Sequence, residues 1–111
     1  MIDVKVSAQE HVVLVEVNGR IDSMTAGQFG EGLSTPIDEG RTNVVLDLGG
    51  VEYMSSAGLR EIVNALKKVK RAGGDLRIAQ PSDRVLEVLE MAGLDTIIQI
   101  FDTQGEAIGS Y

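Results

Sequence analysis

The chain has 111 residues, 43% of them hydrophobic, with no cysteine and a formal net charge of −7. This length and hydrophobic content suit one domain with a packed core, and the lack of cysteine excludes disulfides and thiolate metal sites. The acidic charge argues against nucleic acids and anionic membranes as partners, because binding to either draws on clustered basic side chains.

The N-terminal part of the sequence is typical of a β-hairpin. Residues 3–7 and 12–18 are rich in valine, and they flank the polar segment 8–11, which we expect to form the turn. Residues 19–23 then read as a loop. The sheet is therefore expected to open with two antiparallel strands.

A weakly amphipathic helix is expected over residues 24–39. Apolar residues recur there every four positions, which is the spacing of one helix face; they are Phe29, Leu33 and Ile37. Three glycines fall inside the segment, each costing up to about 1 kcal/mol relative to alanine, so the helix should be loose. The apolar run at 44–48 predicts a strand that is covered on both faces.

The clearest predicted element is an amphipathic helix that follows the pair Ser55-Ser56. Its apolar residues keep the i, i+3, i+4 spacing; they are Leu59, Ile62, Val63, Leu66 and Val69. The pair Gly73-Gly74 should end this helix, since glycine commonly follows a helix C-terminus.

The C-terminal part alternates strands with helices. Residues 76–79 and 97–101 predict strands, and between them Ser82 should cap a helix that Gly93 ends. Residues 102–111 could begin a further helical turn. Strands separated by helices form right-handed crossovers, so we expect one α/β domain with a mixed, mostly parallel sheet flanked by helices.

The usual enzyme motifs are missing. The single histidine, His11, lies in the predicted turn, without a second histidine or a cysteine for acid–base or metal chemistry. Ser56 lies between a strand and a helix, as a hydrolase nucleophile does, but Met54 takes the place of the first glycine of the Gly-x-Ser-x-Gly motif. We therefore expect no catalytic residue, no metal and no cofactor.

The sequence also lacks the features of membrane insertion and export. No apolar stretch approaches the roughly 20 residues that cross a bilayer. The N-terminal segment carries charges inside any hydrophobic region, which does not fit a signal peptide. We expect a cytoplasmic protein with no membrane contact and no direct contact with nucleic acid.

The serine pair admits two interpretations. Ser55 fits the N-cap of the helix, its hydroxyl accepting a hydrogen bond from the amide of Ala57 or Gly58, and Ser56 is then the first helical residue. A cap requires neither a second serine nor the small residues Ala57 and Gly58, which leave room for a phosphate at the helix start. Local physics leaves a structural cap and a phosphorylation switch both open.

The sequence resembles the STAS domain, and specifically the anti-sigma factor antagonists of bacteria. The most specific segment is VVLDLGGVEYMSSAGLREIV, residues 44–63. In the family signature a strand ending in Asp-Leu and a short turn lead to Asp-Ser-Ser/Thr-Gly-Leu, which opens a helix. The similarity continues in VNGRIDSMTA, residues 17–26, and in residues 72–103. It implies a single STAS domain over residues 1–111 with a STAS-like α/β fold.

The resemblance implies a regulatory binding module and not an enzyme. Members of the family bind an anti-sigma factor that is also a serine kinase with the histidine-kinase-like ATPase fold, and this binding frees a sigma factor for transcription. The kinase phosphorylates the antagonist at the helix start and the complex dissociates. A metal-dependent PP2C-type phosphatase then restores the antagonist.

Aligning the family motif onto Met54–Leu59 implies that Ser56 accepts the phosphate. Ser55 replaces the family's acidic residue and Ala57 its second hydroxyl, so the kinase could also choose Ser55. The resemblance places Asp22 beside the serine, although Asp22 could be an ordinary turn aspartate. The residues expected to bind the partner are Asp22, Ser23, Met54, Ser55, Ser56, Gly58 and Leu59.

Two other functions stay open from the sequence. A STAS module could bind its partner constitutively, as a scaffold or as a subunit of an ATPase transport complex, with the serines acting only as caps. A serine hydrolase would require Ser56 to be a nucleophile, which the incomplete motif disfavours.

Overall fold

The computed structural model describes residues 1–111 and contains a mixed five-stranded sheet with the strand order β1-β2-β3-β4-β5. The first two strands form an antiparallel hairpin, and the other neighbouring pairs are parallel. The strands are β1 (Ile2–Gln9), β2 (Val12–Ile21), β3 (Asn43–Met54), β4 (Asp75–Ala79) and β5 (Ile100–Phe101). The predicted mixed α/β fold with its opening hairpin is confirmed.

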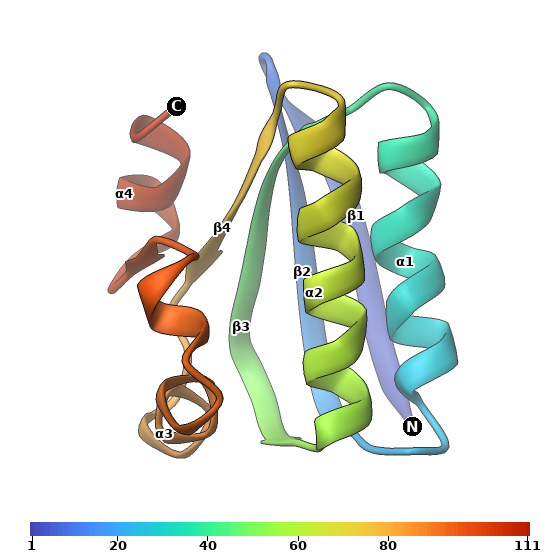
Figure 1. Cartoon of the computed structure of the whole chain (residues 1–111), viewed down its shortest axis with the longest axis vertical. Helices are drawn as coiled ribbons and strands as arrows, with labels where there is room; N and C mark the ends of the chain where they lie inside the picture. Colours follow the sequence, from blue (N-terminus) through green and yellow to red (C-terminus); the bar gives the residue numbers. More distant parts are fainter.

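Helices connect the parallel strands and cover the two faces of the sheet unequally (Figure 1). The helical elements are α1 (Ala26–Asp38), α2 (Ser56–Arg71), α3 (Asp83–Met91), the 3-10 turn η1 (Leu94–Thr96) and α4 (Gln104–Gly109). Successive right-handed crossovers in one direction place α1, α2 and α3 on the same face, and all three contribute to one core cluster of 23 buried residues. The other face carries α4 and a smaller cluster.

Side chains along β2 point alternately to the two faces of the sheet, which explains why the core consists of two clusters. Val13, Val15 and Val17 point to the face with three helices, whereas Val12 and Leu14 point to the face with α4. Both sets are buried, because this part of the strand is covered on both sides. The continuous apolar run at residues 12–15 therefore reflects a strand in the interior of the sheet.

Three predicted boundaries were wrong. The expected loop at 19–23 begins late, since residues 19–21 continue β2, and the strand expected at 97–101 is confined to two residues. The strand expected at 44–48 runs on to Met54. Gly49 and Gly50, which follow the predicted strand, lie where the pairing of β3 with β2 shifts in register, so that the strand bends without ending.

Glycines in α1 allow close packing and do not loosen the helix as the sequence suggested. A Cβ on Gly30 would lie 2.6 Å from the Glu61 carboxylate of α2, and one on Gly32 would lie 2.7 Å from Val4 Cγ1 of β1. The other predicted helix ends are confirmed: Gly73 follows α2 with a φ of 84°, and Ser82 caps α3 by accepting a hydrogen bond from the Val85 amide, 3.3 Å away.

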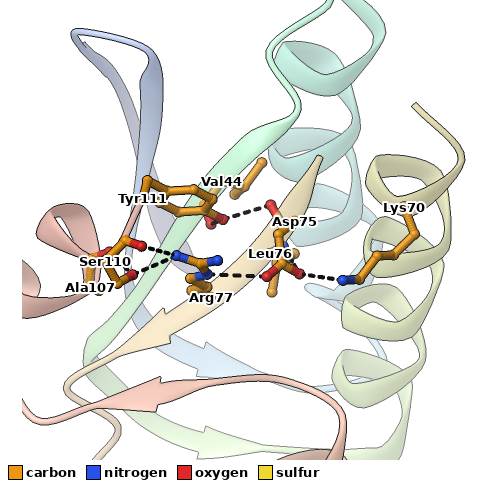
Figure 2. A network of polar contacts seen from close by, with 8 residues as sticks. All are labelled: Val44, Lys70, Asp75, Leu76, Arg77, Ala107, Ser110 and Tyr111. Atoms are coloured by element: carbon orange, nitrogen blue, oxygen red, sulfur yellow. Dashed lines mark hydrogen bonds and ion pairs between the residues drawn. The ribbon is translucent and has the colours of Figure 1, made fainter. Parts of the chain in front are cut away.

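The C-terminal segment is fixed to the sheet by a polar network (Figure 2). The Tyr111 hydroxyl donates to the carbonyl oxygens of Val44 and Asp75, each 2.7 Å away. The Arg77 guanidinium lies 4.0 Å from the centroid of the Tyr111 ring and donates to the Ser110 carbonyl at 2.6 Å. Burial raises the pKa of the Tyr111 hydroxyl, so the group stays protonated and able to donate. These contacts hold α4 on its face of the sheet.

Candidate functional site

The parallel pairing of β2 with β3 brings the two predicted halves of the site together. Ile21, the last residue of β2, pairs with Met54, the last residue of β3. The Ser55 amide then donates to the Ile21 carbonyl at 2.8 Å. The loop after β2 and the start of α2 therefore lie at the same edge of the sheet, at the lower end of the molecule in Figure 1.

The loop after β2 is held by its own hydrogen bonds. Asp22 Oδ1 accepts from the amides of Met24, at 3.0 Å, and Thr25, at 3.2 Å. The Thr25 hydroxyl donates to the Arg20 carbonyl at 2.8 Å. The hydrogen bond from the Met24 amide is the main cause that holds the pKa of Asp22 below its usual value, so this carboxylate is ionised at neutral pH. The loop is thus an ordered, negatively charged feature.

The two serines differ in exposure. Ser55 is the N-cap of α2, with extended backbone angles, and Ser56 is the first helical residue, as predicted. The predicted cap bond is absent, because Ser55 Oγ is turned into the protein, where it is buried without a hydrogen-bond partner. Ser56 is exposed. Only the second hydroxyl is therefore open to another molecule.

The N-terminus of α2 offers a favourable position for an anion beside Ser56. No side chain caps the helix, and its first turn contains no acidic residue. The first amides of a helix lack intrahelical partners and lie at the positive end of its dipole. A phosphate on the Ser56 hydroxyl would therefore be stabilised where it forms.

Three of the predicted partner-binding residues lie inward. Met54 is 2% exposed and Gly58 is buried, while Leu59 packs partly buried against the core. A Cβ on Gly58 would lie 2.5 Å from Met54 Sδ and 2.6 Å from Cγ2 of Ile21. Gly58 thus does not leave the room for a phosphate that the sequence suggested, because the space of its missing side chain lies between α2 and the strands β2 and β3.

Two features of this end of the molecule were not anticipated from the sequence. Met24, at the tip of the ordered loop, is 92% exposed. Arg20 lies over the ring of Tyr53, 4.5 Å from its centroid, because the two residues pair across β2 and β3. A methionine among polar loop residues was visible in the sequence, but the Arg20–Tyr53 pair required the strand register.

The site has no counterpart of a hydrolase or metal centre. His11 lies in the hairpin turn, at the end of β2 opposite to the serines, so it cannot activate Ser56. No three histidine, aspartate or glutamate side chains are grouped to hold a metal ion. No helix has the length and apolarity needed to cross a membrane.

Comparison with known proteins gives consistent matches over nearly the whole chain. The family model of the STAS domain matches residues 3–107. The anti-sigma-B factor antagonist of Bacillus subtilis is 34% identical over 99 residues, which are 89% of this chain and 90% of that protein. The anti-sigma-B factor antagonist of Listeria monocytogenes is 33% identical over 111 residues, 98% of this chain and 95% of that protein. A crystal structure of the Thermotoga maritima protein TM1081 gives a TM-score of 0.91 at 29% identity and covers 96% of this chain and 92% of that one.

Proposed function

The chain belongs to the STAS domain family, and from this premise we propose that it is an anti-sigma factor antagonist switched by phosphorylation of Ser56. When unphosphorylated it binds an anti-sigma factor that is a serine kinase of the histidine-kinase-like ATPase fold. Phosphorylation releases the kinase, and a PP2C-type phosphatase returns the antagonist to its binding form. The cycle controls transcription that depends on the sigma factor.

The observation that carries the proposal is the contrast between the two serines. Phosphoryl transfer requires the acceptor hydroxyl to reach a kinase active site. Ser56 is exposed at an uncapped helix N-terminus, whereas Ser55 Oγ is buried. The geometry supports Ser56 as the acceptor and leaves Ser55 in a structural role.

The same end of the molecule supplies a surface for the partner. Its solvent-accessible side chains come from the loop after β2 and from the start of α2; they are Asp22, Ser23, Met24 and Ser56. Met54, Gly58 and Leu59 lie beneath or beside this surface and fix its shape. Because the loop is hydrogen-bonded internally, little conformational freedom is lost when a partner binds.

Phosphorylation acts on the partner more than on this domain. A phosphate adds about −1.5 to −2 charges and three acceptor oxygens. The helix N-terminus accommodates this group, so the domain stays folded. A partner that packs on a small hydroxyl instead meets bulk and charge, and it is excluded.

Phosphopeptide mass spectrometry on the protein isolated from its own cells tests the proposal. We expect phosphate on Ser56, at a level that changes between growth and stress, because the exposed hydroxyl is the accessible one. The Ser56→Ala variant should carry none. Phosphate on Ser55 would contradict the assignment of the acceptor, and no phosphate under any condition would favour a constitutive STAS module.

Met24 should contribute an apolar contact to the complex. Replacing it by glutamine, which has a similar length, is expected to weaken kinase binding about fivefold to tenfold, since a buried thioether side chain would be lost from the interface. Isothermal titration with the purified kinase measures this change. Met91→Gln is the matched control, because Met91 is 82% exposed but lies at the end of α3. If Met24→Gln and Met91→Gln bind the kinase with equal affinity, Met24 does not contribute to the interface.

A further inference from the structure

The outer edge of β1 is unprotected. This eight-residue strand is the outermost of the sheet and pairs only with β2. Its pairing runs from Ile2 to Gln9 without a register shift, so no bulge twists the edge away. The strand contains no proline, and its exposed lysine, Lys5, lies on the face opposite to Val4 and Val6. A regular edge of this kind presents backbone donors and acceptors on which another strand can pair.

The backbone groups that face this edge can be assigned. The Ile2 carbonyl accepts a hydrogen bond from Gln28 Nε2 of α1, at 3.2 Å, so it points away from β2. Orientation alternates along an antiparallel strand, which gives Val4, Val6 and Ala8 the same outward direction. The Gln28 side chain thus already donates to one carbonyl of this edge, at Ile2.

A groove lies beside the edge, between β1 and α1. Its volume is about 490 Å³. Val4 and Val6 contribute apolar side chains, and the Val6 side chain is 45% exposed. The groove therefore has an apolar wall on its β1 side.

The charge of the groove indicates what kind of chain would fit. Glu31 and Glu39 line it, both are exposed, and neither forms an ion pair. A segment with lysine or arginine side chains would complement them. A second copy of this chain would instead bring the same two carboxylates, and a net charge of −7, against them.

We propose that the β1 edge and its groove bind an extended segment of a partner protein that carries both basic and apolar residues on the face turned toward α1, at every second position. The segment adds a sixth strand beside β1, so main-chain hydrogen bonds supply affinity. Its apolar side chains contact Val4 and Val6, and its basic side chains meet Glu31 and Glu39. This surface is separate from Ser56, which lies at the start of α2.

The probe is a blocked peptide of the sequence Lys-Thr-Val-Thr-Lys-Thr, whose lysines and valine share one face of a strand; it is titrated into the ¹⁵N-labelled full chain and followed by NMR. We expect amide shifts at Val4, Val6 and Ala8 and along residues 31–39, with a dissociation constant of about 0.1–1 mM. The double variant Glu31→Gln/Glu39→Gln should weaken binding about threefold to tenfold. Ser56→Asp should leave binding unchanged, so the result does not depend on the phosphorylation switch.

Two control peptides make the outcome decisive. Replacing both lysines by glutamate should abolish the shifts, and methylating the amide nitrogens that would face β1 should do the same. The proposal is overturned if the basic peptide causes no shifts up to a few millimolar, if the glutamate peptide binds equally well, or if the shifts lie elsewhere. Sedimentation equilibrium that shows a dimer disrupted by Val6→Asp would also overturn it, because a second copy would then occupy the edge.

Discussion

The Ser56→Asp variant is expected to bind the partner kinase about a thousandfold more weakly than the unmodified chain, a loss of about 4 kcal/mol. The substitution places a carboxylate at the centre of the proposed interface, where it would lose water without gaining a partner; such buried, unpaired charges cost several kcal/mol. Ser56→Ala should bind like the unmodified chain and resist release by the kinase and ATP. Isothermal titration with the purified kinase measures both affinities.

Ser82→Asp is the matched control for this experiment. Ser82 is also an exposed serine at a helix start, and aspartate is an equally good N-cap, so α3 should keep its stability. The control adds the same charge at another helix and should leave kinase binding unchanged. If Ser56→Asp and Ser82→Asp bind the kinase equally well, charge at Ser56 does not control the complex, and the proposed switch is wrong.

The sequence predicted secondary structure correctly where burial imposes a regular spacing on the apolar residues. The amphipathic spacing of α2 predicted a helix that buries one face, and the valine-rich segment predicted β2, whose first residues are buried on both faces. It underestimated the length of β3, because Gly49 and Gly50 interrupt the apolar run where the strand continues through a register shift. It overestimated β5, because Ile97 and Ile98 are apolar but lie outside the strand, which begins at Ile100.

The candidate site was predictable in its location but not in its atomic roles. The serine pair marked the start of α2, and the resemblance selected Ser56. Packing between β2, β3 and α2 determines whether a hydroxyl at the start of α2 points inward. A local sequence pattern does not contain this information, so the burial of Ser55 Oγ was not predictable. The same holds for Gly58, whose role depends on Ile21, a residue 37 positions earlier in the chain.

Replacing Gly58 by valine should lower the free energy of unfolding by about 3 kcal/mol. The new Cβ alone would lie 2.5 Å from Met54 Sδ and 2.6 Å from Cγ2 of Ile21. Met54 can change its rotamer, but Ile21 is β-branched and fully buried in β2, so it cannot yield easily. The first turn of α2 would therefore be pushed outward, and the position of Ser56 would change with it. Urea denaturation measures the loss of stability.

Gly27→Val separates this steric effect from helix propensity. Gly27 lies in the first turn of α1, and a Cβ there would meet nothing within 4 Å. Valine is a slightly better helix former than glycine, so this variant should be neutral or gain a few tenths of a kcal/mol. Similar stabilities for the two variants would mean that α2 can move away from β2 and β3 at little cost. The orientation of Ser56 would then not be fixed by Gly58, and the rigid presentation of the hydroxyl to a kinase would lose its structural basis.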